Sequence, residues 1–433
     1  MFSKILIANR GEIAVRIIRA CNEMGISTVS VYSEADEESL HASLADRSIC
    51  IGSSMPQDSY LNQNNIITAA LATGAQAIHP GYGFLAENCD FARLCEENGL
   101  AFIGPKPDVI SKLGDKDNAR KIMKAAGVAV SPGTSIIEGP EEALKSAEEI
   151  GYPLLIKARS GGGGKGIRLV NSASELKDAF LTARAEAENA FGDGGLYMEK
   201  YLNPVKHIEV QILADESGNA VSLGERECSI QRNNQKLIEE SPSPAITQVL
   251  REKLADAAVK ATKAVGYTGV GTVEFLLDRN NEFYFMEMNT RLQVEHPVTE
   301  SVTGIDVVKW QIRTAAGVSL DFLQEDVKIS GASIECRINA RTSGEIKVLH
   351  VPGGPWVRFD TALYQSYIVP PYYDSMLGKL IVHAKTREEA LRKMKASLSE
   401  LVIDGIENNI EEQIAIIDSE PFRSGDYYTN FTI

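Results

Sequence analysis

The side chains best suited to chemistry in this sequence are concentrated in one stretch, residues 283–300, which reads FYFMEMNTRLQVEHPVTE. Side chains on an extended strand alternate between its two faces. An extended conformation here would put five polar residues on one face, namely Glu287, Asn289, Arg291, Gln293 and Glu295. A strand that only packs in a core does not need such a set of charged and hydrogen-bonding groups. The stretch therefore predicts one wall of a binding site.

A predicted hairpin places two carboxylates opposite each other. Two strand-like segments rich in apolar and β-branched residues flank the sequence DRNNE at 278–282, whose two asparagines tolerate left-handed dihedrals and predict a two-residue turn. Counting outward from that turn gives the pairs Leu277–Tyr284 and Glu274–Glu287. Carboxylates directly across a ladder repel each other, and a bound Mg²⁺, which prefers oxygen ligands and also takes substrate phosphates, would remove the repulsion. An exposed hairpin face with charges screened by water is the alternative.

A glycine-rich loop flanked by lysines is the second candidate site. A predicted strand, LLIK at 154–157, is followed by ARSGGGGKG at 158–166. Glycine permits the dihedrals and the close approach by which backbone N–H groups can surround a phosphate, although a merely flexible turn is the alternative. The loop is not a Walker A motif, because no Gly-Lys-Ser/Thr follows at the required spacing. The residues concerned are Gly161, Gly162, Gly163, Gly164 and Gly166, and the flanking Lys157 and Lys165 favour the phosphate interpretation.

The whole-chain composition excludes several classes of protein. The net charge of −15 disfavours sequence-independent nucleic-acid binding, which relies on a basic surface. No uncharged apolar run approaches the ~20 residues of a membrane span, and the first residues, MFSKILIANRGE, contain no signal-peptide core. Six scattered cysteines without a CxxC pair predict a reduced, cytoplasmic compartment rather than a disulfide framework or a zinc site.

The first 113 residues alternate between predicted strands and helices. The strands are predicted at 4–8, 27–32, 77–79 and 100–103, and the helices at 11–24, with Asn9 as the N-cap, and at 62–73. Such alternation predicts a parallel sheet covered by helices. Residues 1–113 are therefore interpreted as one α/β domain.

The rest of the 433-residue chain is long enough for further domains. A helical connection is predicted at 114–129, with Lys116 at a helix start where the backbone attracts anions; a solvated surface lysine is the alternative. Residues 130–202 contain the glycine loop and form a candidate lid. Residues 203–433 are strand-rich, with helices predicted at 248–265 and 387–401. The fold class expected is a multidomain combination of α/β and α+β.

Four motifs in this order resemble biotin carboxylase, the ATP-grasp subunit of acetyl-CoA carboxylase and related biotin-dependent carboxylases. They are IANRGEIAVRI at 7–17, HPGYGFLAEN at 79–88, FMEMNTRLQVEHPVTE at 285–300 and PPYYDSMLGKL at 370–380. The resemblance runs from residue 5 to about residue 417. It implies an ATP-grasp fold with a Rossmann-like preATP-grasp domain at the N-terminus, a hinged lid and a C-terminal domain. It also implies that bicarbonate and MgATP give carboxyphosphate, whose CO₂ passes to N1 of biotin on a carrier protein.

The resemblance assigns a nucleotide and metal site. Lys116 and Lys157 would hold ATP phosphates beneath the glycine loop, which the resemblance places over the nucleotide. Glu199, Lys200 and Leu202 would line the adenine pocket, with His207 and Gln231 near the ribose. The ligands of Mg²⁺ or Mn²⁺ would be Glu274, Glu287 and Asn289.

The resemblance also assigns the reacting groups. Bicarbonate would be bound by Lys236, Arg291, Gln293 and the backbone of Val294, with Glu295 as its general base. A carboxylate suits this role because bicarbonate must lose its proton, and the cations offset the charge of two anions brought together. Arg337 would stabilise the biotin enolate oxygen and Tyr82 would lie near the biotin ring. An ion pair from Arg337 to Glu335 or another carboxylate is the alternative.

Two segments depart from the family pattern. In QRNNQK, residues 231–236, asparagines replace residues that are commonly basic. A histidine there is associated with the nucleotide phosphates, so Asn234 is expected in the ATP site but carries no charge. The segment 341–349 is several residues shorter than usual. The shortening is expected to alter local packing and the surface near Trp356 and Arg358, where family dimers meet.

The resemblance implies a biotin carboxyl carrier protein and carboxyltransferase subunits as partners, and a homodimer. Met394-Lys395 is predicted to lie in an amphipathic helix rather than in a biotinylated hairpin, and His296 is predicted to be structural. A weakened homologue with a nucleotide-binding, regulatory role, and another ATP-grasp carboxylate–amine ligase, remain as alternatives. A nicotinamide oxidoreductase is disfavoured, because no GxGxxG follows the first strand. The final carboxyl acceptor is left open, with acetyl-CoA favoured.

Overall fold

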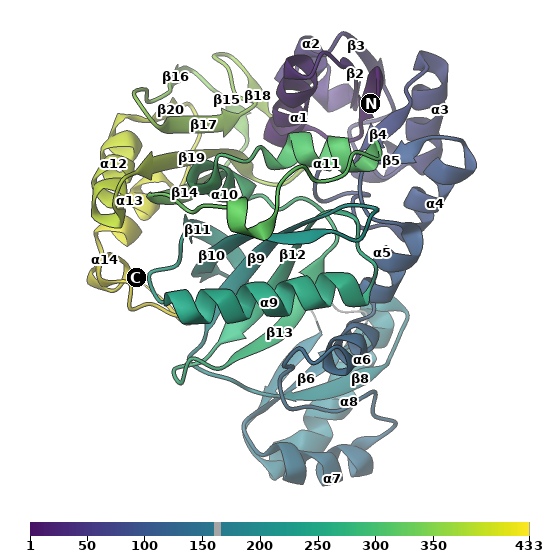
Figure 1. Cartoon of the computed structure of the whole chain (residues 1–433), viewed down its shortest axis with the longest axis vertical. Coiled ribbons are helices and arrows are strands. Elements are labelled where there is room, and N and C mark those ends of the chain that lie inside the picture. The colour runs from purple at the N-terminus through teal and green to yellow at the C-terminus, as the bar shows by residue number, and fades with distance from the viewer. Residues whose placement is uncertain (160–165, 433) are drawn as a thin grey trace.

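A parallel sheet occupies the N-terminal part of the molecule. The structure, a computed structural model, describes residues 1–159 and 166–432 (Figure 1). Within these residues a five-stranded parallel sheet has the order β3-β2-β1-β4-β5. Its strands are β1 (Lys4–Ile7), β2 (Ser27–Tyr32), β3 (Arg47–Cys50), β4 (Ala77–His79) and β5 (Ala101–Phe102). Its helices are α1 (Gly11–Glu23), α2 (Leu40–Leu44), α3 (Gln63–Thr73), α4 (Cys89–Glu97) and α5 (Pro107–Gly114). The predicted parallel sheet is confirmed.

The residue predicted as the cap of α1 has a different role. The helix begins at Gly11 with Arg10, not Asn9, at the N-cap position. The Asn9 side-chain amide instead donates to the carbonyls of Pro80 and Tyr82, at 2.7 and 2.8 Å. Gly81 adopts a positive φ of 64°, and a Cβ there would come within 2.9 Å of the Asn9 side chain. Asn9 therefore fixes the loop that carries Tyr82 against the end of β1.

A larger antiparallel sheet forms the centre of the described molecule. Its eight strands have the order β13-β12-β9-β10-β11-β14-β19-β17. They are β9 (Lys206–Ala214), β10 (Ala220–Arg232), β11 (Gln235–Ser241), β12 (Gly269–Leu277), β13 (Phe283–Asn289), β14 (Ala332–Asn339), β17 (Val357–Thr361) and β19 (Met376–Ala384). Helix α9 (Gln248–Ala264) packs on one part of this sheet (Figure 1). The helices that follow α9 along the chain are α10 (His296–Thr303), α11 (Val307–Ala315), α12 (Arg387–Glu400), α13 (Ile410–Asp418) and α14 (Glu420–Ser424).

A small separate layer lies at the lower end of the molecule as drawn in Figure 1. Its three-stranded sheet, as far as the chain is described, has the order β7-β6-β8 and carries two helices with a core of their own. The elements are β6 (Leu154–Ala158), β7 (Ile167–Val170), β8 (Leu196–Lys200), α7 (Pro140–Ile150) and α8 (Ala173–Phe191), and α6 (Lys116–Ala125) leads into this layer. Short 3₁₀ turns are η1 (Glu34–Asp36), η2 (Pro56–Asp58) and η3 (Gln324–Asp326).

The shortened C-terminal segment packs into the fold. It forms β15 (Gly344–Glu345), paired with β18 (Ile368–Val369), and β16 (Val348–His350), paired with β20 (Val402–Asp404). Ile346 between them is fully buried and belongs to the C-terminal hydrophobic core, so the shortened segment is anchored at this residue. Met394 and Lys395 lie in α12, as predicted, with Met394 buried and Lys395 paired with Asp418. None of the helices in the described ranges is both long and apolar enough to cross a membrane.

The predicted hairpin is correct at its carboxylates and wrong at its turn. Glu274 lies opposite Glu287, but Leu277 pairs with Phe283 rather than Tyr284. The turn is longer than two residues, because the Asp278 carboxylate accepts from the backbone N–H groups of Asn280 and Glu282. A bulge between Glu274 and Phe275 then shifts the register by one and restores the predicted carboxylate pair.

The expected extended wall ends earlier than predicted. Strand β13 stops at Asn289, and α10 begins at His296 with Pro297 in its first turn. Residues 290–295 form a connecting turn instead of continuing the strand. The period-two argument therefore fails beyond Asn289, and the positions of Arg291, Gln293 and Glu295 are set by this turn.

The two asparagines that depart from the family pattern have a conformational role. Asn233 and Asn234 adopt positive φ angles of 51° and 62°. They form the two-residue turn between β10 and β11, in which Arg232 pairs with Gln235. This connection requires left-handed dihedrals at both positions, which asparagine tolerates better than most residues.

We expect Asn233→Val to lower the free energy of unfolding by about 1 kcal/mol, because a β-branched residue is strained at a positive φ. Asn233→Gly should stay within about 0.5 kcal/mol of the parent chain, since glycine adopts this conformation freely. Urea denaturation followed by circular dichroism measures both variants. Equal losses for valine and glycine would contradict the conformational explanation.

Candidate functional site

Most of the predicted site residues line one cavity of about 1160 Å³. It is bordered by the loop after β4, the β6–β8 layer, the large sheet and the turn before α10. The predicted residues at its wall are Tyr82, Lys116, Lys157, Glu199, Lys200, Leu202, His207, Gln231, Asn234, Lys236, Glu274, Glu287, Asn289, Arg291, Gln293, Val294, Glu295 and Arg337. Gly161–Gly164 lie outside the described residues, and Gly166 is described but is not part of this wall.

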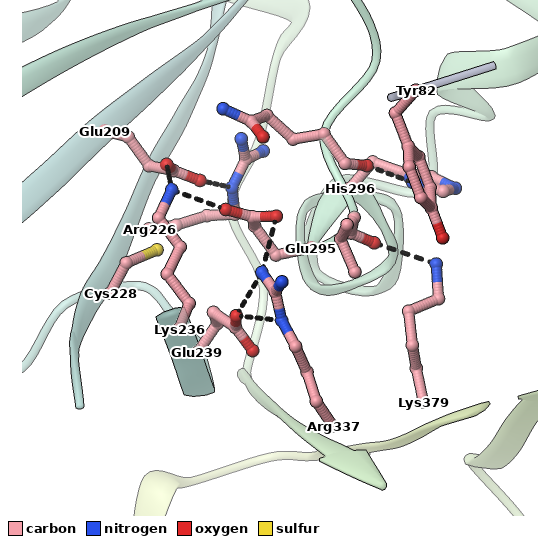
Figure 2. A network of polar contacts seen from close by, with 12 residues as sticks. Tyr82, Glu209, Arg226, Cys228, Lys236, Glu239, Glu295, His296, Arg337 and Lys379 are labelled. Carbon is pink, nitrogen blue, oxygen red and sulfur yellow. Dashed lines mark hydrogen bonds and ion pairs between the residues drawn. The ribbon is translucent and has the colours of Figure 1, made fainter. Parts of the chain in front are cut away.

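Glu295 lies at the centre of a buried network of charges (Figure 2). It is fully buried immediately before α10. One carboxylate oxygen lies 2.7 Å from the Lys236 ammonium and the other 3.0 Å from the Arg337 guanidinium. Burial alone would raise the pKa of Glu295, but the charges of Lys236 and Arg337 overcome it and hold the pKa well below its usual range. Glu295 is therefore an ionised carboxylate in the free protein.

Lys236 is shared among three carboxylates. Besides Glu295, it contacts Glu209 at 2.6 Å and Glu274 at 3.0 Å. Glu209 is in turn held by Arg226, a fully buried arginine that also donates to a glutamine and two threonines, Gln211, Thr272 and Thr299. Burial opposes the charge of Lys236, yet the three carboxylates raise its pKa well above the ordinary value. The ammonium is thus fixed in position and charged.

Glu209 and Arg226 are missing from the sequence prediction. The signal that could have found Glu209 is the same one that marked residues 283–300. In strand β9 (Lys206–Ala214), the polar residues His207, Glu209 and Gln211 alternate with apolar ones, although the strand is buried throughout. A polar face on a buried strand again points to a site rather than to a core. Arg226 has no comparable local signal.

Arg337 joins Glu295 to a second buried carboxylate. Its Nε donates to Glu239 at 2.6 Å, across the β11–β14 pair. The ion pair considered from the sequence does form with carboxylates, but they are Glu239 and Glu295 rather than Glu335. Burial raises the pKa of Glu239 to about 7 against the opposing charge of Arg337. Arg337 is therefore held between two carboxylates beside the cavity.

The opposed carboxylates Glu274 and Glu287 fit a hard divalent cation. Glu274 lies 3.0 Å from His207 and accepts from Asn289 at 2.8 Å, whereas Glu287 is paired with Lys116 at 3.0 Å. Their oxygens are the donors that Mg²⁺ and Mn²⁺ take in proteins. Among the described residues, two further sets of possible ligand atoms lie within 4.8 Å of one another. One set is His207, Glu209 and Glu274, and the other is Glu209, Cys228 and Glu295.

The lysines predicted to hold phosphates are paired with carboxylates in the free protein. Lys157 lies 2.8 Å from Glu199, which also accepts from Arg120 at 2.8 Å and Ser131 at 3.1 Å. Burial would raise the pKa of Glu199, but the charges of Lys157 and Arg120 lower it. The Lys200 ammonium donates to the carbonyls at 151 and 152, so it fixes the layer's own backbone.

The remaining predicted residues are oriented by neighbouring side chains. Arg291 donates to Glu87 at 2.9 Å, to Gln293 at 2.9 Å and to Asn289 at 3.2 Å. The His207 ring contacts the Gln231 amide at 3.1 Å. These contacts converge from separate strands and the turn at 290–295.

His296 and Tyr82 complete this part of the site. His296 is buried with its Nδ1 2.8 Å from the carbonyl of Gln293, and burial lowers its pKa well below the usual value. The imidazole is therefore neutral, and its contact with the turn supports the predicted structural role. The Tyr82 hydroxyl donates to Glu12, at the start of α1.

Comparisons with known proteins identify the group to which this chain belongs. Its sequence matches the biotin carboxylase N-terminal domain over residues 1–110 and the biotin carboxylase C-terminal domain over 335–432. Between them, residues 115–323 match the ATP-binding domain of the carbamoyl-phosphate synthase L chain. Biotin carboxylase 1 of Bacillus subtilis is 57% identical over 441 residues, covering all of this chain and 98% of that protein. The chain belongs to the biotin carboxylase family. It is an ATP-dependent ligase with an ATP-grasp fold.

Further relatives include a biotin carboxylase and the corresponding parts of two keto-acid carboxylases. A pyruvate carboxylase component of Methanothermobacter thermautotrophicus is 52% identical, covering all of this chain and 89% of its own. The Campylobacter jejuni biotin carboxylase in complex with β,γ-ATP is 48% identical with a TM-score of 0.97, covering 99% of this chain and 98% of its own. The biotin carboxylase domain dimer of Hydrogenobacter thermophilus 2-oxoglutarate carboxylase, with MgADP, ADP and bicarbonate, is 50% identical with a TM-score of 0.95, covering 99% and 96%.

The lowered pKa of Glu295 predicts a dependence of stability on pH. The Glu295 carboxylate takes up a proton at a higher pH in the unfolded chain than in the folded chain. Its ionised form therefore stabilises the fold above roughly pH 4.5, and this stabilisation is lost as the pH falls toward the folded-state pKa. Between about pH 5 and pH 3.5, the free energy of unfolding should fall more steeply for the parent chain than for Glu295→Gln. Urea denaturation at several pH values measures the two slopes. Equal slopes would show that Glu295 is not ionised in the way described.

Proposed function

We propose that this chain carboxylates biotin on a carrier protein, with bicarbonate as the source of CO₂ and ATP as the energy-supplying substrate. The observation that carries the proposal is the buried carboxylate of Glu295 between Lys236 and Arg337, beside a cavity large enough for a nucleotide and a second substrate. Two cations on one buried carboxylate suit a site in which further anions must approach. The family of the chain supports the same reaction.

In the proposed first step, Glu295 takes the proton of bicarbonate and a bicarbonate oxygen attacks the γ-phosphorus of ATP. The products are carboxyphosphate and ADP. A base whose pKa is strongly lowered accepts a proton poorly. Bicarbonate drawn to Lys236 and Arg291 would share those cations, which raises the pKa of Glu295 and makes proton transfer favourable. The base is thus activated by the arrival of its own substrate.

The proposed nucleotide site uses the residues that border the other part of the cavity. Lys116, Lys157, the glycines Gly161–Gly164 and Gly166 would contact phosphates, and Glu199, Lys200, Leu202, His207, Gln231 and Asn234 would surround the nucleoside and its phosphates. Glu274, Glu287 and Asn289 would hold Mg²⁺ or Mn²⁺, which when bound would offset negative charge on phosphoryl oxygens. An anionic phosphate can replace a carboxylate as the partner of Lys116 or Lys157, so neither lysine would be left uncompensated. Residues 130–202, which include the three-stranded layer, would act as the lid.

In the proposed second step, carboxyphosphate releases CO₂ and phosphate, and biotin N1 attacks the CO₂. The phosphate released beside N1 is a base able to take the N1 proton. Arg337 would stabilise the enolate oxygen of biotin, because its guanidinium is fixed at the cavity wall by Glu239. Tyr82, on the loop after β4, would lie along the biotin ring.

We further propose that the chain is the biotin carboxylase component of acetyl-CoA carboxylase in the cytoplasm. It would act there as a homodimer with a biotin carboxyl carrier protein and carboxyltransferase subunits. The Bacillus subtilis relative, 57% identical, is named biotin carboxylase with no keto acid in its name, whereas the relatives from pyruvate and 2-oxoglutarate carboxylases are 52% and 50% identical. Those two enzymes are the competing assignments. Trp356 is 71% exposed, an unusual exposure for a tryptophan that supports a protein interface around it.

The proposed reaction is tested by ADP release from the purified chain with MgATP, with and without bicarbonate and with and without free biotin. We expect bicarbonate-dependent release that biotin stimulates. Adding purified carrier proteins and then acetyl-CoA, pyruvate or 2-oxoglutarate with the matching carboxyltransferase distinguishes the final acceptor. Tight ATP binding without bicarbonate-dependent release, with free biotin or with a carrier, would instead indicate a nucleotide-binding regulatory homologue.

We expect Glu295→Gln to lower biotin carboxylation by at least about 10²-fold while the affinity for ATP changes little, because a general base is lost and a nucleotide contact is not. Incorporation of labelled bicarbonate into biotin and nucleotide binding by calorimetry measure the two effects. Glu335→Gln is the matched control: burial raises the pKa of Glu335 well above its usual range, so glutamine resembles its neutral form. Preserved turnover in Glu295→Gln would remove Glu295 as the base.

A further inference from the structure

A fully buried lysine reaches the turn that carries Glu295 from the side opposite Lys236. Lys379, on β19, has no solvent exposure. Its ammonium donates to the carbonyl of Val294 at 2.8 Å and lies 3.2 Å from Glu12. In the view of Figure 2, Lys379 and Tyr82 lie on one side of Glu295 and Lys236 on the other. This lysine has no place in the reaction proposed above.

The contact to Val294 fixes the orientation of one particular peptide group. The carbonyl of Val294 belongs to the peptide that joins Val294 to Glu295, so holding it restricts the direction in which the Glu295 side chain leaves the backbone. Burying an ammonium is costly unless it is paired and hydrogen-bonded. A lysine at this position therefore has a role that an apolar side chain could not fill. Its hydrogen bond to the carbonyl is charge-assisted, and such bonds are stronger than those between neutral groups.

The same lysine is connected to the biotin side of the cavity. Glu12, on α1, is buried and accepts the hydroxyl of Tyr82 as well as the ammonium of Lys379, both on the same carboxylate oxygen. Burial and the neighbouring charge of Glu12 raise the pKa of Tyr82 well above its usual value, so its phenol remains protonated and donates. Three contacts thus lead from Tyr82 through Glu12 and Lys379 to the carbonyl beside Glu295.

We propose that Glu12 and Lys379 are positioning residues that couple the biotin-facing loop at Tyr82 to the bicarbonate-facing turn at Val294–Glu295. The inference rests on the proposed function and deepens it. Without the Tyr82 hydroxyl, Lys379 is the remaining donor to Glu12 among these residues. The Glu12 carboxylate then attracts the Lys379 ammonium more strongly and draws it away from the Val294 carbonyl. The geometry of the base then depends on a residue at the other subsite.

The decisive variant is Tyr82→Phe assayed without biotin. The substitution keeps the ring and removes only the hydroxyl that donates to Glu12. We expect the KM for bicarbonate in ADP release to rise about threefold although no biotin is present, and Lys379→Met to raise it about tenfold, as loss of a charge-assisted hydrogen bond would. In the Lys379→Met background, Tyr82→Phe should add nothing. Nucleotide affinity should stay within about twofold of the parent chain in both variants, since neither residue contacts the proposed nucleotide site.

Two further variants separate positioning from a general loss of stability. Lys206→Met removes another buried lysine that donates to backbone carbonyls, those of Gly425 and Tyr427, and it should leave the bicarbonate KM unchanged. Glu12→Gln combined with Lys379→Met removes both charges together and protects the fold if Lys379→Met alone is unstable. This double variant should still show the raised bicarbonate KM.

The outcomes distinguish failure of this inference from failure of the proposed function. A parent chain that releases no ADP in response to bicarbonate, alone or with biotin, would overturn the proposed function. An active parent chain with unchanged bicarbonate KM in Tyr82→Phe and Lys379→Met would overturn the coupling. A crystal structure of Lys379→Met decides independently of activity: an unmoved Val294–Glu295 peptide would also overturn the coupling, and a rotated one would support it.

Discussion

The buried charge of Glu295 is the constraint on which the rest of the site depends. This carboxylate can be ionised inside the protein only because Lys236 and Arg337 lie on either side of it. Each of those cations is shared with a further buried carboxylate, Glu209 for Lys236 and Glu239 for Arg337. Removing one member of such a set leaves an uncompensated buried charge, which typically costs about 3–5 kcal/mol. Each charge of the network is therefore stabilised by the others.

The architecture of the large sheet follows from this requirement. Strand β9 carries Glu209, strand β11 carries Lys236 and Glu239, and strand β14 carries Arg337. The turn before α10 carries Glu295. Only a sheet that places these strands near one another can bring these charges within contact distance beside the cavity. The bulge in β12 has a comparable effect on Glu274, because it sets the register that puts this carboxylate opposite Glu287. The irregularities of the sheet thus determine which side chains meet.

Ion pairs would also prepare the cavity for the proposed anionic substrates. Lys116 and Lys157, which face the proposed phosphate positions, are compensated by Glu287 and Glu199 in the free protein. A phosphate entering the cavity would take over from the carboxylate as partner of each lysine, and Glu287 would then be free for a divalent cation. Substrate binding would exchange one set of charge pairs for another. Such an exchange avoids burying an unpaired charge at any stage.

The sequence by itself determined the features that depend on neighbouring residues. The alternation of strands and helices in the first 113 residues predicted the parallel sheet, and the polar face of residues 283–289 marked the wall of a site. Most of the site residues that the motif resemblance named line one cavity, although they make up less than half of its wall. Local sequence was less informative at turns: the asparagines at 280–281 do not form the predicted tight turn, whereas those at 233–234 do form one.

Only the tertiary structure decided which charges are partners. Lys236 and Glu295 are 59 residues apart in the chain, and Arg337 and Glu239 are 98 apart. Composition and periodicity show that a side chain is polar and which face it takes, but the energy of a buried charge depends on groups that arrive from other strands. For the same reason no pattern in the sequence indicated Arg226 or the Tyr82–Glu12–Lys379 connection. Backbone patterns are local, whereas the compensation of a buried charge acts through space.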